Sequence, residues 1–391
     1  MTPKGFLFST AEAAIKKPGK KDLALIYSGV EASISGTFTT NNIKAAPVKI
    51  NIKKIRSGRG QAIIINSGNA NACTGKKGLQ DAAEIIRLSA KGLKIKPSLV
   101  YICSTGVIGT PLPMDRIRLR IPELIDQLGK SSIEDVAAAI MTTDTFSKIV
   151  NKKLKVDNKI GTIAGISKGA GMIWPHMATM LCFIMTDIAV NQKTLNRVML
   201  DAVKKSFNRI TVDGDRSTND TALVIANGLI GNREVTEKSS SFKVFRNAIH
   251  EVTYELSRLI VKDGEGATKV IEIEVKGAVN EKDAEKVAFS VANSNLVKTA
   301  AYGNDANWGR IMSAIGYSGV KVREEKIDIH TGNVKVAVKG LGTGKDKEAS
   351  DALKRKEVKV VINLNSGRSS AKVLTCDLTE EYVKINAAYR T

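Results

Sequence analysis

Apolar and polar positions along the chain predict both strands and amphipathic helices. Short apolar runs of strand length lie at residues 61–66 (QAIIIN) and 99–104 (LVYICS), and the longer run at residues 179–190 (TMLCFIMTDIAV) predicts a buried strand. Apolar residues recur at helical spacing from Asn191 onward, and again between Phe242 and Leu259. A further helix should start at Ser131, because Ser131 and Glu134 fit a capping box. This mixture indicates an α/β or α+β protein with mixed sheets.

The pattern changes beyond about Asn280, where charged, strand-like segments such as KIDIHTGNVKVAVKG and VKVVINL dominate. A chain of 391 residues is long enough for two domains. We therefore expect a larger domain over residues 1–280 and a smaller α/β domain over residues 281–391.

The formal net charge of +21 raises the question of a nucleic-acid partner. The basic residues are spread along the chain, and no aromatic residues interleave with them as a stacking surface would require. We expect no nucleic-acid partner and interpret the charge as a solvated surface. The sequence also lacks a run of about 20 apolar residues and an N-terminal secretory signal, so we expect a cytoplasmic protein without a membrane anchor.

Cysteine, histidine and glycine-rich motifs exclude several kinds of site. The four cysteines lie far apart and are expected to be small buried hydrophobic residues in a reducing compartment. The three scattered histidines show no zinc-ligand spacing, so we expect no metal. The segment GLGTGKD at 340–346 has the wrong spacing for a phosphate loop, and we expect no bound cofactor.

A threonine at a loop–strand junction is the strongest candidate for chemistry. The segment KGAGMIWPHMATML, residues 168–181, changes from a loop with glycines and a proline into an apolar run at Thr179. A threonine hydroxyl needs a base, and an N-terminal threonine can use its own α-amine. A cut between Ala178 and Thr179 would create that N-terminus. An ordinary threonine at a strand start explains the same pattern.

The cleavage segment resembles that of the ArgJ family, the glutamate N-acetyltransferase/ornithine acetyltransferases. Other segments agree in the same order along essentially the whole chain: FTTNNIKAAPV, INSGNANACTG, STGVIG, MTTDT, SFNRITVDGDRSTNDT, DGEGATK, VKTAAYGNDANWGRI and INAAYRT. The resemblance implies a layered mixed-sheet sandwich similar to that of N-terminal-nucleophile enzymes. It also implies self-cleavage into an α chain, residues 1–178, and a β chain, residues 179–391, with two copies of each.

The resemblance further implies an activity in arginine biosynthesis. Thr179 would take acetyl from N2-acetylornithine and pass it to glutamate. Some family members also use acetyl-CoA, and the sequence leaves open whether this chain does. A hydrolase or aminopeptidase that uses the same N-terminal threonine is the alternative.

Matching by position assigns the remaining roles. Thr105 and Gly106, in STG, correspond to the oxyanion hole, and a strand end before glycine suits that task. The substrate-binding set comprises Thr142, Lys168, Thr179, Glu265, Asn386 and Thr391. Lys168 would meet a carboxylate and Glu265 an ammonium of the amino-acid substrate. Without the resemblance, both would be interpreted as surface charges and the C-terminal pair as part of a frayed tail.

Two residues of the cleavage loop depart from the family pattern. Trp174 and His176 stand where smaller or amide residues are expected. His176 precedes Thr179 by three residues and could change the rate of cleavage. A neutral loop variation is the simpler interpretation.

Overall fold

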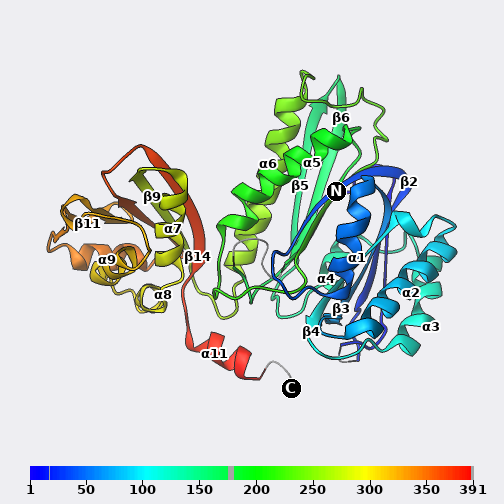
Figure 1. Cartoon of the computed structure of the whole chain (residues 1–391), viewed down its shortest axis with the longest axis horizontal. Helices are drawn as coiled ribbons and strands as arrows, with labels where there is room; N and C mark the ends of the chain where they lie inside the picture. Colours follow the sequence, from blue (N-terminus) through cyan, green and yellow to red (C-terminus); the bar gives the residue numbers. More distant parts are fainter. Residues whose placement is uncertain (17, 175–179, 389–391) are drawn as a thin grey trace. The chain divides into compact units, whose positions relative to one another are not determined.

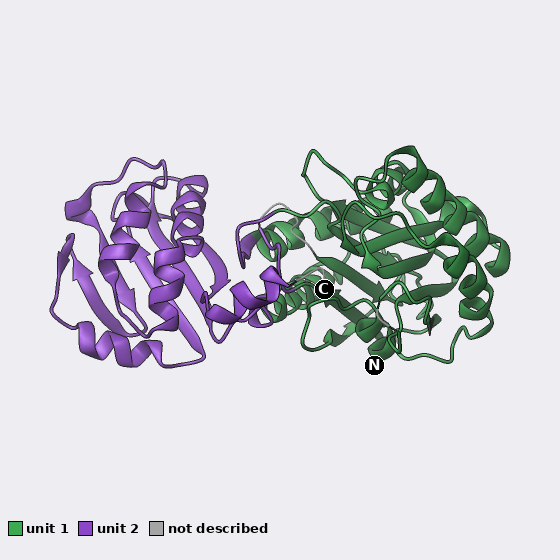
Figure 2. Cartoon of the chain, turned by 90° about the horizontal axis from the view of Figure 1, so that it is seen from below, with its two compact units in different colours: residues 1–169, 176–208, 216–260 green, residues 170–175, 209–215, 261–391 purple. Residues whose placement is uncertain are grey.

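The computed structural model describes residues 1–16, 18–174 and 180–388, which form two compact units (Figure 1, Figure 2). Unit 1 holds the described residues of 1–169, 176–208 and 216–260, and unit 2 those of 170–175, 209–215 and 261–391.

Unit 1 is built on one mixed sheet with the strand order β4-β3-β2-β8-β7-β6-β5, and β1 pairs with β2. Its elements in chain order are β1 (Phe6–Ala11), β2 (Leu23–Phe38), α1 (Ala46–Lys54), β3 (Arg59–Asn69), α2 (Gly75–Leu93), β4 (Val100–Val107), α3 (Met114–Asp126), α4 (Ile133–Ala139), β5 (Lys148–Val156), β6 (Lys159–Lys168), β7 (Leu181–Thr186), α5 (Gln192–Lys205), β8 (Thr221–Ala226) and α6 (Phe242–Lys262). The pairs β3–β4 and β7–β8 are parallel and the others antiparallel. The predicted class, α/β with mixed sheets, is confirmed.

Alternating side chains divide unit 1 into layers. Ile63 and Ile65 of β3 and Phe183 of β7 belong to one buried core. Ile64 points the opposite way, into a second core with residues of α2 and α3. Gly165 of β6 lies against α6. Helices α2, α3 and α6 therefore pack on the face of the sheet opposite the shared core, which agrees with the layered sandwich that the resemblance implies.

Unit 2 contains a six-stranded sheet of order β12-β11-β10-β13-β9-β14. Its elements are β9 (Val270–Ala278), α7 (Glu281–Ala292), α8 (Asn295–Tyr302), α9 (Trp308–Gly316), β10 (Asp328–Thr331), β11 (Val334–Val338), β12 (Leu341–Gly342), α10 (Asp346–Leu353), β13 (Glu357–Asn363), β14 (Ser369–Cys376) and α11 (Glu380–Ala387). Strand β9 pairs with both β13 and β14 and so belongs to this unit. The change of pattern near Asn280 marks the start of α7, which Asn280 caps, and not the first residue of the unit.

Two local expectations differ from the structure. The capping box of α4 is formed by Ser132 and Asp135, one residue later than Ser131 and Glu134. Ser131 instead approaches Thr10, with 3.1 Å between the two hydroxyl oxygens. Cys73 is exposed, whereas the other three cysteines are buried as expected.

The predicted helices and strands around the candidate site are present. Asn191 caps α5, and α6 spans the whole second periodic segment. The apolar run after the cleavage segment is β7, buried along its length. Within the described ranges, no helix is long and apolar enough to cross a membrane.

Candidate active site

The structure describes most of the residues singled out from the sequence. Thr105, Gly106, Thr142 and Lys168 belong to unit 1, whereas Trp174, Glu265 and Asn386 belong to unit 2. His176, Ala178, Thr179 and Thr391 lie outside the described residues. The predictions for these four residues stay predictions.

Thr105 and Gly106 lie at the end of β4, where parallel pairing sets them beside Ser67 and Gly68 of β3. Gly106 has a φ of 133°, and a Cβ there would overlap the backbone of Gly68. Only glycine allows this close approach of the two strands. Thr105 itself is buried, at 4% exposure.

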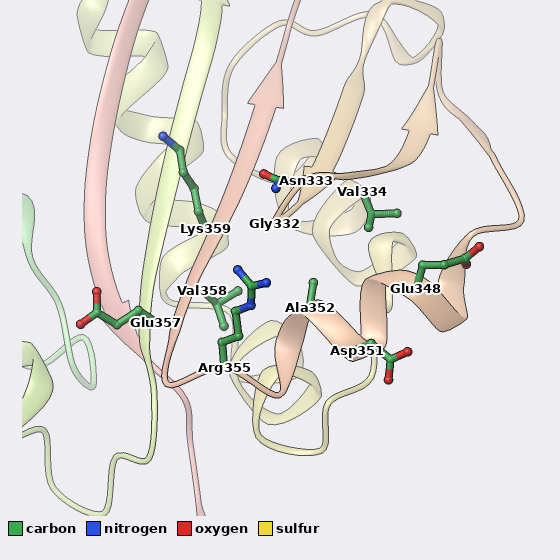
Figure 3. Close-up of a pocket in the computed structure, with 10 residues that line it drawn as sticks. All are labelled: Gly332, Asn333, Val334, Glu348, Asp351, Ala352, Arg355, Glu357, Val358 and Lys359. Atoms are coloured by element: carbon green, nitrogen blue, oxygen red, sulfur yellow. The ribbon is translucent and has the colours of Figure 1, made fainter.

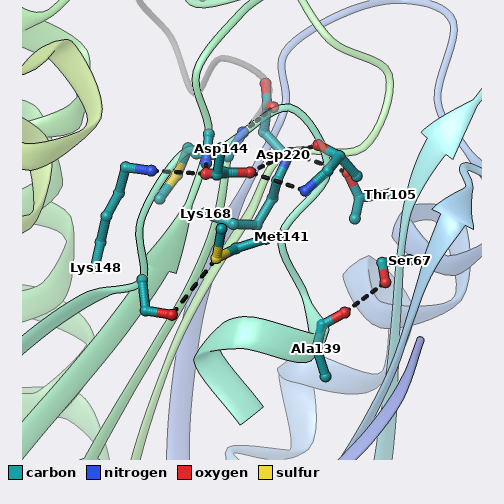
Figure 4. Close-up of polar contacts among 12 residues, drawn as sticks. Ser67, Thr105, Ala139, Met141, Asp144, Lys148, Lys168 and Asp220 are labelled. Atoms are coloured by element: carbon teal, nitrogen blue, oxygen red, sulfur yellow. Dashed lines mark hydrogen bonds and ion pairs between the residues drawn. The ribbon is translucent and has the colours of Figure 1, made fainter. Parts of the chain in front are cut away.

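Lys168 contacts two other residues of unit 1 that were predicted to belong to the active site. It is the last residue of β6 and only 2% exposed. Its Nζ donates to Thr142 Oγ1 at 2.7 Å and to Thr105 Oγ1 at 3.4 Å (Figure 4). Because the lysine uses the oxygens of both hydroxyls as acceptors, both hydroxyl protons can point elsewhere and donate to a ligand.

A carboxylate that was not predicted lies beside this cluster. Asp144 forms ion pairs with Lys148 at 2.7 Å and with Lys168 at 3.8 Å. It also accepts hydrogen bonds from the backbone N–H groups of Thr142 and Gly169. Burial acts to raise the pKa of Asp144, but the charges of Lys168 and Lys148 and these hydrogen bonds hold it well below its usual range.

The start of β7 is anchored by a second buried carboxyl group. The backbone N–H of Met180, the residue after Thr179, donates to Asp220 Oδ1 at 3.0 Å. The Met180 carbonyl accepts from the N–H of Thr221 at 3.1 Å. Burial raises the pKa of the Asp220 carboxyl well above its usual range. The chain position directly after Thr179 is therefore fixed between β7 and β8.

A second group of predicted residues meets within unit 2. Asn386 of α11 donates through Nδ2 to Glu265 Oε2 at 2.8 Å. The Glu265 backbone N–H donates to the Ala170 carbonyl at 3.0 Å. A Cβ at Gly171 would overlap the Glu265 carboxylate, so the glycine leaves room for it. This helix of the C-terminal tail is thus tied to Glu265, and Glu265 is 8% exposed and not a surface charge.

Asp213 binds the described part of the predicted cleavage segment. Its carboxylate accepts from the N–H groups of Met172 at 2.5 Å and Ile173 at 2.9 Å. Burial raises the pKa of Asp213 to about 6. Trp174 packs against Phe289, with 6.1 Å between ring centroids, which gives this departure from the family pattern a packing role.

A surface pocket of about 400 Å³ lies elsewhere in unit 2 (Figure 3). It is lined by residues of α10, β11 and β13, with Arg355 and Lys359 on one side and Glu348 and Asp351 on the other. None of the described site residues lines it. This pocket therefore does not identify the active site.

Sequence reasoning missed several residues that support the site. Asp144 lies within MTTDT, and Asn219 and Asp220 lie within the segment that ends in STNDT. Asn219 Nδ2 donates to the carbonyls of Ser104 at 2.8 Å and Ala70 at 2.6 Å, which fixes the strand end before Thr105. The signal that could have found these residues is that they lie within segments that resemble those of the ArgJ family. Their roles depend on contacts between residues far apart in the chain.

The chain is similar in sequence to the proteins of one known family. The model of the ArgJ family matches residues 7–391. The arginine biosynthesis bifunctional protein ArgJ of Geobacter sulfurreducens is 51% identical over 393 residues and covers 100% of both chains. The protein of the same name from Caldanaerobacter subterraneus is 48% identical and covers 100% of this chain and 98% of its own.

A crystal structure of another ArgJ protein is also similar to this chain. The arginine biosynthesis bifunctional protein ArgJ of Bacillus halodurans superposes with a TM-score of 0.52 at 44% identity. The match covers 53% of this chain and 98% of that chain. From a family match along nearly its whole length and relatives at about half identity, we conclude that the chain belongs to the ArgJ family.

Proposed function

We propose that this ArgJ-family enzyme transfers acetyl from N2-acetylornithine to glutamate through an acetyl ester on Thr179. The observation that carries the proposal is the convergence of Lys168 on Thr142 and Thr105. Lys168 also pairs in register with Leu181, two residues after Thr179. Thr179, the predicted nucleophile, is therefore only two residues away in sequence from the position of β7 that pairs with Lys168.

Self-cleavage is the first step of the proposed mechanism. The Thr179 hydroxyl oxygen attacks the Ala178 carbonyl carbon, and the peptide C–N bond breaks as the nitrogen takes up a proton. Water then hydrolyses the resulting ester between the two segments. The products are a free α-amine and a free hydroxyl on Thr179, which is the arrangement that an N-terminal threonine nucleophile requires.

Acetyl transfer then proceeds in two halves. In the first, the α-amine takes the hydroxyl proton while the oxygen attacks the acetyl carbonyl of N2-acetylornithine. The Thr105 hydroxyl and the Gly106 N–H stabilise the negative charge on the carbonyl oxygen. Ornithine leaves with the proton. In the second half, the glutamate amine attacks the threonine ester and takes the acetyl group, which restores the hydroxyl.

Both substrates share an α-amino-acid carboxylate, and we assign its recognition to Lys168 and Thr142. We assign recognition of the ammonium group of the substrate to Glu265, and we assign Asn386 and Thr391 to the same substrate-binding set. Support comes from the burial of Lys168 and Glu265 and from the bond between Asn386 and Glu265. We further propose acetyl-CoA as a second donor, because the relatives are named bifunctional.

The working assembly in this proposal contains two α and two β chains in the cytoplasm. The experiment that tests the function supplies purified protein with N2-acetylornithine and glutamate, and in parallel with acetyl-CoA and glutamate. Formation of ornithine and N-acetylglutamate is the expected result. Release of acetate in place of N-acetylglutamate would support the hydrolase alternative. Absence of both products would reject the proposal.

A further inference from the structure

One buried carboxylate contacts several groups of the candidate site at once. The Asp144 side chain is fully buried, at 0% exposure, as is that of Lys148. We propose that Asp144 is a positioning residue that fixes Lys168 and Thr142 for recognition of the substrate carboxylate. This inference rests on the proposed function, which assigns carboxylate recognition to those two residues.

The two oxygens of Asp144 have separate tasks. Oδ1 accepts from the Gly169 N–H at 2.6 Å and from Lys148 Nζ at 2.7 Å, so it joins the end of β6 to the start of β5. Oδ2 accepts from the Thr142 N–H at 3.0 Å and lies 3.8 Å from Lys168 Nζ. One carboxylate therefore ties together two strands and two predicted substrate-binding residues (Figure 4).

The contacts on Oδ2 close a ring. Lys168 Nζ donates to Thr142 Oγ1 at 2.7 Å, and the backbone of Thr142 donates to the same carboxylate that faces the lysine. The ring sets the ammonium relative to the Thr142 hydroxyl and to Thr105 Oγ1. A long lysine side chain has many rotamers, and fixing it in advance removes an entropic cost from ligand binding.

Only a carboxylate can fill this role. An asparagine of the same shape has one oxygen, so it would lose its acceptor on either the Gly169 side or the Thr142 side. A buried charge is tolerated when it is paired and hydrogen-bonded, and Asp144 has two ammonium groups and two backbone N–H groups around it.

The test must separate the loss of positioning from a change in the net charge of the cluster and from a loss of folding. Asp144→Asn alone removes the carboxylate beside the buried Lys148 and is expected to be unstable. The double variant Asp144→Asn/Lys148→Met removes one negative and one positive charge, so the net charge of the cluster is unchanged. The matched control is Lys148→Met, which keeps the contacts of Asp144 with Thr142, Gly169 and Lys168.

The measurement is calorimetric binding of L-ornithine and of L-glutamate to the full chain, with thermal unfolding as the folding check. We expect the double variant to bind both amino acids more weakly by on the order of tenfold, which corresponds to about 1.4 kcal/mol. We expect the control to stay within about threefold of the wild type. Should the double variant fail to fold, Asp144→Glu is measured in its place, because it keeps the negative charge beside Lys148 and displaces both carboxylate oxygens by one methylene.

Wild-type affinity in the double variant would overturn the inference. Equal weakening in the double variant and in Lys148→Met would overturn it too, because the effect would then belong to Lys148. Acetyl transfer by the wild type is recorded in the same preparation. A wild type that transfers acetyl while the double variant binds normally rejects the positioning role alone, whereas a wild type that neither binds nor transfers rejects the proposed function as well.

Discussion

Three buried or half-buried aspartates near the site have pKa values that are shifted in different directions because their partners differ. Asp144 has two ammonium groups beside it, and its pKa is held well below its usual range. Asp220 has backbone and hydroxyl partners, and burial raises its pKa well above that range. Burial raises the pKa of Asp213 to about 6. The environment of each aspartate thus sets the direction in which its pKa departs from the ordinary value.

The first prediction concerns the oxyanion hole. Thr105→Ala removes one of two proposed donors to the developing oxyanion, so kcat should fall by about 10²–10³ while KM changes little. Steady-state kinetics with N2-acetylornithine and glutamate measure this. Thr105→Ser keeps the hydroxyl and serves as the control. A change confined to KM would mean that Thr105 only binds substrate.

The second prediction concerns stability and pH. A carboxyl with a raised pKa binds its proton more tightly in the folded state, so its contribution is present at low pH and is lost as pH rises. For Asp213 this loss should occur between the ordinary 3.8 and about 6. Asp213→Asn does not titrate. In urea unfolding over this range, wild type should lose stability relative to the variant as pH rises, and a constant difference would contradict the pKa assignment.

At the scale of elements, the close pairing of β3 and β4 fixes the strand end that carries Thr105 and Gly106, the proposed oxyanion hole. The third prediction is that Gly106→Ala destabilises the protein by on the order of 3 kcal/mol, because alanine adds backbone overlap to an unfavourable φ. Gly109→Ala is the matched control, since Gly109 also has a positive φ but open space around it. It should cost about 1–2 kcal/mol. Equal losses in urea unfolding would show that the overlap is relieved without cost.

Element prediction from the sequence succeeded where one face of a segment is strongly apolar. The periodic residues of α5 and α6 and the apolar run of β7 are confirmed. The N-cap of α4 was misplaced by one residue because Ser131 and Ser132 are adjacent and both are followed by an acidic residue three positions later. Local sequence cannot choose between two such caps, whereas the contact of Ser131 with Thr10 can.

At the scale of the whole molecule, the predicted cut falls between two paired strands. Strand β6 pairs with β7, and β2 pairs with β8. Cleavage between them would leave β2 and β6 on one product and β7 and β8 on the other, so both products share one sheet. The fourth prediction is that the two chains co-elute in size-exclusion chromatography and separate only in denaturant. Separation in native buffer would contradict the shared sheet.

The site was predictable from the sequence only through motifs. Lys168 and Glu265 looked like surface charges from composition, and their burial depends on strands and loops that are distant in the chain. Asp144 escaped notice because its role is a set of contacts with Lys148, Lys168 and Gly169. Periodicity and spacing report the face on which a residue lies, but they do not report which side chains from other elements meet it.

The central claim is that Thr179 carries the acetyl group, and intact-mass spectrometry tests it most directly. Purified protein is incubated with N2-acetylornithine and no acceptor. We predict two chains, residues 1–178 and 179–391, with the second heavier by one acetyl group that maps to Thr179 and is lost when glutamate is added. Thr179→Ala should remain a single, unlabelled chain. A cleaved, active enzyme with no acetyl on Thr179 would contradict the account and indicate direct transfer between bound substrates.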